Sequence, residues 1–182
     1  MTLQIARIAS TRLGDIQRPI RLSYAGQVLR VKGSNLRPKR QFGQIGVELV
    51  GSPSPKADSE IILMAADALS NLGIKNLSID LCLPTLVPAI CKSHKIDSTA
   101  IINRLRIALD EKDKPAVELL EKELGNETNY IFSSLLESVG PVDEALKLLR
   151  KINLPQNAFA ELNQLSDVIS CLKRQAPDLT IT

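Results

Sequence analysis

Five cations lie within eleven residues and form the densest polar cluster of the sequence: Arg30, Lys32, Arg37, Lys39 and Arg40. The planar guanidinium group of an arginine binds a phosphate or a carboxylate with two parallel hydrogen bonds. A strand also holds such a group more rigidly than a loop does. The cluster therefore predicts a phosphate site, while a solvated basic loop between two strands explains the same residues equally well.

A second candidate site lies on the segment from Gln41 to Val50, where polar and apolar residues alternate. Every second side chain of a strand points to the same side, which groups Gln44 and Glu48 with Phe42 and Gly46. Glu48 can bind an ammonium group, and the Gln44 amide offers both a donor and an acceptor beside the small glycine. This face predicts the floor of a pocket for a polar ligand. The alternative is the solvent-exposed polar face of a half-covered sheet.

Other common kinds of site find no support in the sequence. His94 has no serine or cysteine nucleophile motif beside it, and we interpret it as a surface histidine. Cys82, Cys91 and Cys171 are irregularly spaced and have no accompanying histidine pair, so they predict neither a disulfide framework nor a zinc site. The nucleotide-loop, metalloprotease and hydrolase-elbow motifs are absent from the sequence. We therefore expect no catalytic residue, no metal and no cofactor.

The composition predicts a globular protein with one sizeable core. The chain has 182 residues, of which 44% are hydrophobic and 24% are charged, and its net charge is +3. That charge is too small to indicate a nucleic-acid or membrane partner, and aromatic residues, at 3%, are too few for a base-stacking surface. No apolar run approaches the roughly 18 residues of a membrane span. We expect a cytoplasmic protein.

The elements that must position these residues follow from the spacing of apolar side chains. Helical spacing predicts a helix over about residues 2–13. Alternation predicts strand segments at 20–24 and 27–31, which we interpret as one strand with a bulge, and a further strand at 41–50. Two antiparallel strands joined by a polar, basic loop is the simplest arrangement.

The remainder of the sequence changes from mixed to helical character. A helix is predicted to begin at Asp58 or Ser59 and to end at Gly73, a residue type common after the last turn of a helix. The segment Leu77–Leu83 alternates and predicts another strand. From Thr85 onward, helical periods recur between proline and glycine breaks, which predicts a helical subdomain. The final residues read as the beginning of a strand, so we expect a chain cut from a longer protein.

Four spaced segments resemble the catalytic core of the histidyl-tRNA synthetases, which are class II aminoacyl-tRNA synthetases. Residues 1–7 resemble the end of the family's R-P-D-x-T segment, and residues 18–30 resemble its motif 2 strand, R-P-x-R-x-x-Y-x-G-x-V-x-R. Residues 40–51 resemble the return strand, R-[EQ]-F-x-Q-x-G-x-E-x-x-G, and residues 58–61 match the acidic start of the next helix. The resemblance is specific because these segments occur in the family's order.

The resemblance implies an α+β fold, with a partial class II aminoacyl-tRNA-synthetase-like antiparallel sheet, flanking helices and a helical insertion subdomain. The partial core with the motif 2 hairpin would occupy residues 1–84. The helical insertion would occupy residues 85–175, and residues 176–182 would begin the return strand to the core.

The same resemblance assigns roles to individual side chains. It implies that Thr2, Arg30, Gln44 and Glu48 bind histidine. Arg30 would be the motif 2 arginine, which in the synthetases binds the α-phosphate of ATP and the carboxylate of the substrate. If phosphate or ATP binding is retained, Arg30 and Arg40 would provide it.

Two groups of proteins share this core: the tRNA ligases, and inactive regulatory subunits that pair with the short-form ATP phosphoribosyltransferase catalytic subunit. The ligases usually carry a G-R-Y-R-E-F loop, whereas residues 36–42 read L-R-P-K-R-Q-F and resemble the regulatory group. The resemblance therefore implies a non-enzymatic subunit for the first step of histidine biosynthesis, sensitive to histidine and homodimeric through its core. The alternative is a fragment of a histidyl-tRNA synthetase, which would bind tRNA and ATP.

Overall fold

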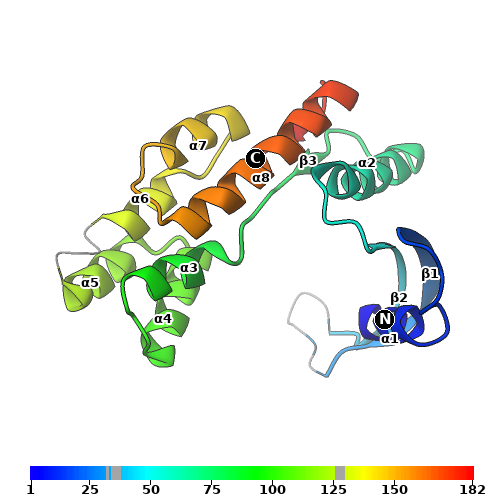
Figure 1. Ribbon diagram of the computed structural model, residues 1–182, viewed down its shortest axis with the longest axis horizontal. Helices are drawn as coiled ribbons and strands as arrows, with labels where there is room; N and C mark the ends of the chain where they lie inside the picture. The colour runs from blue at the N-terminus through cyan, green and yellow to red at the C-terminus, as the bar shows by residue number, and fades with distance from the viewer. Residues whose placement is uncertain (32, 34–37, 126–129) are drawn as a thin grey trace. The chain divides into compact units, whose positions relative to one another are not determined.

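The structure is a computed structural model that describes residues 1–31, 33, 38–125 and 130–182. Its chain divides into two units, Met1–Ala68 and Leu69–Thr182, and Figure 1 traces their elements in chain order. Lys32 and Arg37, two members of the predicted basic cluster, lie outside the described residues. Residues 36 and 37, the first part of the loop whose sequence resembles the regulatory group, also lie outside the described residues.

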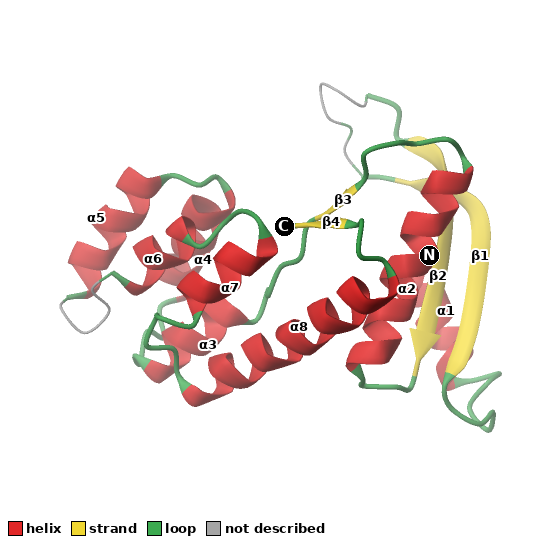
Figure 2. Ribbon diagram, turned by 90° about the horizontal axis from the view of Figure 1, so that it is seen from above, coloured by secondary structure: helices red, strands yellow, loops and turns green. Residues whose placement is uncertain are grey.

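A two-stranded antiparallel hairpin is the centre of the first unit. Strand β1 (Ile20–Leu29) pairs with strand β2 (Gln41–Val50) over the full length of both, from Ile20 opposite Val50 to Leu29 opposite Gln41 (Figure 2). The predicted hairpin is confirmed. The predicted bulge in the first strand is wrong, because the register runs through Ala25 and Gly26 without a break.

Strand alternation gives the hairpin two different faces. We call one of them the even face, and it is formed by Leu22, Tyr24, Gly26, Val28, Phe42, Gln44, Gly46 and Glu48, all half-buried. On the opposite face, the apolar Leu29 and Ile45 are 78% and 84% exposed. The alternative interpretation of this strand required its polar side chains to lie on the solvent-exposed face of the hairpin. Gln44 and Glu48 lie instead on the more buried of the two faces.

One helix contacts each face of the hairpin. Helix α1 (Thr2–Ser10) lies against the even face, where the Met1 side chain comes within 3.2 Å of the position that a Cβ atom would take at Gly26. Helix α2 (Pro55–Asn71) is bound to the opposite face by Arg21, whose Nη2 donates to Glu60 Oε2 at 2.8 Å. The first predicted helix is confirmed, although it ends at Ser10 rather than near residue 13.

The ends of α2 follow from local chemistry. The helix begins at Pro55, three residues before the predicted start, because the Ser54 hydroxyl accepts a hydrogen bond from the Ala57 N–H at 3.3 Å. Proline is well suited to the first helical position, where its missing N–H costs nothing. At the other end, Gly73 has a φ of +85°, and the Ile74 N–H donates to the Leu69 carbonyl at 3.2 Å. Gly73 thus terminates the helix as predicted.

The second unit is mainly helical and contains the larger apolar core. Its helices are α3 (Leu86–Ser93), α4 (Thr99–Asp110), α5 (Lys114–Leu124), α6 (Ile131–Glu137), α7 (Val142–Leu149) and α8 (Gln156–Gln175). Ile90, Leu105 and Phe132 are fully buried at the centre of this core. The helical periodicity predicted from Thr85 onward is confirmed. The division at residues 84 and 175 stays a prediction.

Two short strands pair in parallel within the second unit. β3 (Ser78–Ile79) lies beside β4 (Thr180–Ile181), and the Thr182 N–H donates to the Ile79 carbonyl at 2.9 Å (Figure 2). The strand expected at Leu77–Leu83 is therefore shorter than predicted, although one more hydrogen bond follows it, from the Leu81 N–H to the Thr182 carbonyl at 2.8 Å. No helix in the described part of the chain is long and apolar enough to cross a membrane.

Candidate functional site

The even face of the hairpin brings together most of the residues that the sequence singled out. The antiparallel register places Gln44 opposite Gly26, Gly46 opposite Tyr24, and Glu48 opposite Leu22. Gln44 and Glu48 therefore lie on one surface, along the same strand, as predicted from their spacing.

Tyr24 lies across the strand directly over Gly46. A Cβ atom at Gly46 would be 2.3 Å from both Cζ and Oη of Tyr24, so the ring occupies the space that a side chain would fill. The Gln44 amide Nε2 donates a hydrogen bond to Tyr24 Oη at 3.3 Å. The Tyr24 ring therefore fills the space beside Gly46 and brings a hydroxyl within hydrogen-bonding distance of Gln44. That this face floors a pocket for a polar ligand stays a prediction.

Arg30 lies at the loop end of the same face. Its guanidinium carbon is 4.7 Å from the centre of the Phe42 ring, which places a cation beside the start of β2. Such a contact is worth roughly 0.5–1 kcal/mol at an exposed site. The Arg30 N–H donates to the Arg40 carbonyl at 2.8 Å and extends the ladder by one pair. The even face thus carries a positive charge near one end and the Glu48 carboxylate near the other.

Thr2 and Arg40 are less closely tied to this surface. Thr2 is exposed and is the first residue of α1. Its neighbour Met1 contacts Gly26, which faces Gln44 across the hairpin, so α1 begins at the level of Gln44. Arg40 is exposed and joins the hairpin through its main chain. The two arginines proposed for phosphate therefore flank the connecting loop.

A cavity of about 230 Å³ lies between the hairpin and α2. Its lining is formed by Arg21, Leu22, Ser23, Val47, Glu48, Glu60, Ile61 and Met64. The hydrogen bond from Arg21 lowers the pKa of the Glu60 carboxyl below its ordinary value, so this ion pair holds a carboxylate at one wall of the cavity. Glu48 belongs to both the even face and this cavity.

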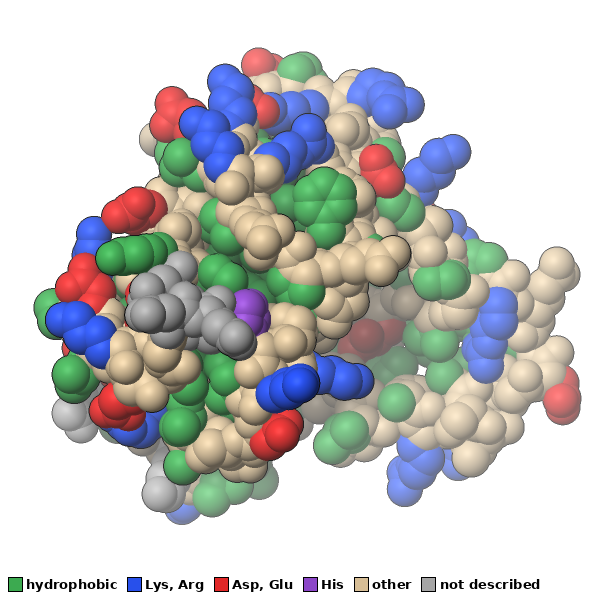
Figure 3. Space-filling model, turned by 60° about the vertical axis from the view of Figure 1, so that its left-hand side comes forward, with side chains coloured by type: hydrophobic (Ala, Val, Ile, Leu, Met, Phe, Trp, Pro, Cys, Tyr) green, Lys and Arg blue, Asp and Glu red, His purple; other side chains and the backbone are tan. Residues whose placement is uncertain are grey.

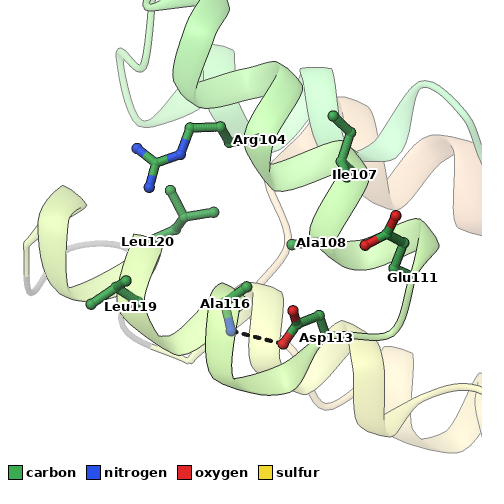
Figure 4. Close-up of a pocket in the computed structure, with 8 residues that line it drawn as sticks. All are labelled: Arg104, Ile107, Ala108, Glu111, Asp113, Ala116, Leu119 and Leu120. Carbon is green, nitrogen blue, oxygen red and sulfur yellow. Dashed lines mark hydrogen bonds between the residues drawn. The ribbon is translucent and has the colours of Figure 1, made fainter.

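A second cavity, of about 250 Å³, lies between α4 and α5 in the helical unit (Figure 4). Figure 4 shows Arg104, Ile107 and Glu111 on one side, and Ala116, Leu119 and Leu120 on the other. Asp113 closes one end, where its Oδ1 accepts a hydrogen bond from the Ala116 N–H at 3.1 Å and caps α5. None of the site residues predicted from the sequence lines this cavity.

The remaining predicted features are spread over the chain. His94, interpreted from the sequence as a surface histidine, is half-buried at the C-terminal end of α3. Within the described residues, no group of three or more His, Cys, Asp or Glu side chains is arranged to hold a metal ion. On the face drawn in Figure 3, basic and acidic side chains lie interspersed, which agrees with the small net charge of the sequence.

Tyr24 is the residue of this surface that no sequence pattern singled out as a site residue. In the sequence it occurs only as the tyrosine of the motif 2 pattern. Its position opposite Gly46 was the available signal, because in an antiparallel pair a large aromatic residue can cross over a facing glycine. The pairing of Tyr24 with Gly46 depends on the register of the two strands, which the alternation of polar and apolar residues does not fix.

Comparisons with known proteins agree along the whole chain. The family model described as histidyl-tRNA synthetase matches residues 1–182. The ATP phosphoribosyltransferase regulatory subunit of Paramagnetospirillum magneticum is 47% identical over 182 residues, which cover 100% of this chain and 47% of that protein. The proteins of the same name from Rhodospirillum centenum and Rhodospirillum rubrum are 44% and 37% identical, with 46% of each covered by the whole chain. The chain therefore spans about half the length of these relatives.

A solved structure shares the fold. It is described as the crystal structure of an ATP phosphoribosyltransferase regulatory subunit/histidyl-tRNA synthetase from Bacillus halodurans C. The TM-score is 0.85 at 24% sequence identity, with 100% of this chain and 47% of that chain covered. This likeness confirms the predicted α+β architecture, with its partial class II synthetase-like sheet and helical insertion.

Proposed function

The chain belongs to the histidyl-tRNA synthetase family, and on that premise we propose that it is part of a regulatory subunit of ATP phosphoribosyltransferase. The observation that carries this proposal is the match of its full length to curated relatives of that name. In this proposal the protein has no catalytic activity of its own. It serves the first step of histidine biosynthesis and helps to transmit feedback inhibition by histidine.

The even face of the hairpin is the proposed histidine-binding surface, with Thr2, Arg30, Gln44 and Glu48 as its binding residues. Support comes from the order of charges, because Arg30 can bind a carboxylate and Glu48 can accept hydrogen bonds from N–H groups. Gln44 and Glu48 point to the same side of one strand, so they can contact different parts of one ligand. A histidine, with a carboxylate, an ammonium group and a ring N–H, offers a partner for each of these side chains.

Arg30 and Arg40 are the proposed phosphate-binding residues, if the protein has kept a nucleotide site. Both lie next to the connecting loop and both are exposed. The loop sequence departs from the synthetase pattern, which argues against ATP being positioned for adenylate formation.

The partner that fits this proposal is the short-form ATP phosphoribosyltransferase catalytic subunit, bound in a hetero-oligomer in the cytoplasm. A homodimer through the synthetase-like core is part of the same proposal. Neither a membrane nor tRNA is a partner in it.

The test uses the full-length protein, because the chain spans about half of its relatives. It should co-purify with the short-form catalytic subunit and raise the rate of phosphoribosyl transfer, and histidine should inhibit the complex. Full-length protein that carries Glu48→Ala should still assemble and activate, but lose the response to histidine. Failure of the unaltered protein both to co-purify and to change the rate would contradict the proposal.

The alternative is a histidyl-tRNA synthetase, favoured by the description of the family itself. In that case Arg30 stabilises charge on the α-phosphate while histidine is activated, and Gln44 and Glu48 hold the amino acid. Histidine-dependent exchange of pyrophosphate into ATP by the full-length protein would establish this alternative and exclude a purely regulatory role.

A further inference from the structure

We propose that Arg18 is a positioning residue of the candidate histidine site. Its guanidinium group fixes the C-terminal end of α1 to the hairpin, and this attachment sets the place of Thr2 at the other end of the helix. The inference rests on the proposed function, because Thr2 is one of the proposed histidine-binding residues. Arg18 itself belongs to none of the groups of binding residues named above.

The C-terminal end of α1 depends on Arg18 for one hydrogen bond. The last carbonyl groups of an α-helix have no N–H partner within the helix. The Leu13 N–H reaches back to the Ile8 carbonyl at 3.0 Å, and the next carbonyl, that of Ala9, accepts from Arg18 Nη2 at 2.9 Å. Ala9 is only 3% exposed, so water has little access to replace this bond. A cation at the C-terminal end of a helix also interacts favourably with the helix dipole.

Gly51 provides the surface along which the Arg18 side chain runs. Gly51 follows β2 directly and has a φ of +93°, a conformation that favours glycine. A Cβ atom at this position would be 2.8 Å from each of Cβ, Cγ and Cδ of Arg18. The stem of Arg18 therefore lies against the main chain at the end of the hairpin where Ile20 pairs with Val50. Arg18 is thus joined to the hairpin by its stem and to α1 by its guanidinium group.

The other terminal nitrogen of Arg18 indicates that the side chain contributes more to position than to stability. Arg18 Nη1 is buried and has no hydrogen-bond partner among the described residues. A buried donor without an acceptor is unfavourable, and this cost offsets part of what the bond to Ala9 contributes. An apolar side chain of similar length would avoid the cost, but it would not attach the helix end at one defined atom.

Contacts near opposite ends of α1 fix its direction on the even face. At the N-terminal end, Met1 Sδ and Cε lie 3.5 and 3.2 Å from the position that a Cβ atom would take at Gly26. A thioether side chain is flexible, and its contact is not directional. Thr2 and Ala9 are roughly 10 Å apart along the helix, at a rise of about 1.5 Å per residue. Loss of the Arg18 bond frees the C-terminal end, so α1 can tilt about Met1 and turn about its own axis.

The Thr2 hydroxyl is the proposed binding group whose place depends on this attachment. A hydrogen bond weakens steeply when its angle departs from linearity, so a small turn of α1 reduces what the hydroxyl contributes to binding. Arg18 thereby contributes to histidine affinity without contacting the ligand.

The experiment measures L-histidine binding to the full-length protein by calorimetry, and a thermal scan checks that each variant is folded. Arg18→Met keeps an unbranched side chain against Gly51 and removes the donors to Ala9. Arg12→Met is the matched control, because it removes an exposed arginine close to the same end of α1. Thr2→Val removes the proposed binding hydroxyl and keeps the shape of the side chain.

We expect Arg18→Met to weaken L-histidine binding about fivefold, the size of one net hydrogen bond, and Arg12→Met to leave it unchanged. Arg18→Lys restores a donor on a side chain that is shorter by one bond, so its loss should be smaller. In a Thr2→Val protein, Arg18→Met should produce no further loss of affinity, because the hydroxyl that Arg18 positions is gone. A purely structural role would weaken binding equally with and without that hydroxyl.

Four results would overturn the inference: unchanged histidine affinity in Arg18→Met, an equal loss in Arg12→Met, unchanged affinity in Thr2→Val, or the same loss from Arg18→Met with and without the Thr2 hydroxyl. If Arg18→Met does not fold, Arg18→Lys decides the matter through the same comparison.

Each of these results leaves the other proposed binding residues standing if the unaltered protein binds histidine. Absence of histidine binding by the unaltered full-length protein would overturn both the proposed site and the role of Arg18. The regulatory function would then be judged separately, by co-purification with the catalytic subunit.

Discussion

The Glu121 carboxylate accepts a hydrogen bond of 2.6 Å from the Ser133 hydroxyl, inside the core of the helical unit. Glu121 is only 4% exposed, and its other oxygen accepts from the main-chain N–H groups of Phe132 and Ser133 at 2.8 and 3.1 Å. A side chain of α5 thus caps the first turn of α6. Three donors offset the cost of burying the carboxylate, which would be large if it were unpaired.

Glu121→Ala should lower the free energy of unfolding by about 3 kcal/mol, because it leaves buried N–H and hydroxyl donors without an acceptor. Urea unfolding followed by circular dichroism measures the change. Glu118→Ala provides the control, since Glu118 is an exposed residue of the same helix and its removal should cost less than about 0.5 kcal/mol. Equal effects of the two variants would contradict the capping role.

Glu48→Ala should abolish histidine binding by the full-length protein without unfolding the hairpin, because it removes the carboxylate from the even face and leaves the strand pairing intact. Calorimetry with L-histidine measures the affinity, and a thermal scan checks that the fold is kept. Glu48→Gln, which keeps the shape of the side chain, separates loss of charge from loss of packing. Unaltered histidine affinity in Glu48→Ala would exclude this residue from the site.

Gly46→Ala should destabilise the hairpin by about 1–3 kcal/mol, because the added methyl group overlaps the Tyr24 ring. Gly43→Ala is the matched control on the same strand. There the nearest atom to an added Cβ is Gln27 Nε2 at 3.9 Å, an ordinary contact distance. Replacing Tyr24 by alanine should remove most of the extra cost of Gly46→Ala, as measured in a double-mutant cycle. A similar loss at both glycines would show that the ring does not restrict Gly46.

The Arg21–Glu60 ion pair should make the stability of the folded protein depend on pH. Hydrogen bonding to Arg21 lowers the pKa of Glu60 in the folded protein, so the pair stabilises the fold above the unfolded pKa of the carboxyl. This contribution disappears as the pH falls through the lowered, folded value. Melting temperatures of the unaltered protein and of Glu60→Gln should therefore differ at pH 7 and converge once the pH falls below the lowered, folded pKa of Glu60.

The same convergence should be seen with Arg21→Gln, which removes the other partner of the pair. A difference between unaltered protein and either variant that stays constant from neutral to acidic pH would contradict the assignment.

Cys91 should resist alkylation in the folded protein, whereas Cys82 should react. Burial raises the pKa of the Cys91 thiol, and the side chain is 1% exposed, so little reactive thiolate forms and reagents cannot reach it. Cys82 is exposed. Iodoacetamide labelling followed by peptide mass spectrometry distinguishes the two, and labelling in urea gives the unfolded reference. Equal labelling of both thiols in the native protein would contradict the burial of Cys91.

Several features of the molecule follow from neighbouring residues alone. Alternation along residues 41–50 placed Gln44 and Glu48 on one face, because side chains of a strand repeat every second residue. Gly73 terminates α2 because it can adopt the positive φ that the end of the helix needs. The order of the motif segments indicated the family. In each case the determining interaction lies within one element or one pattern of the chain.

Other features depend on segments that meet only in the folded chain. Tyr24 covers Gly46 because of one particular strand register, and a shift by a single residue would turn its ring to the opposite face. Glu121 caps α6 from α5 because helix packing brings its carboxylate to three donors. Such contacts follow from the tertiary structure, since register and packing are selected by the whole set of contacts rather than by local periodicity. The sequence by itself therefore determined which polar side chains share one face of the hairpin, and the tertiary structure decided that the Tyr24 ring lies among them.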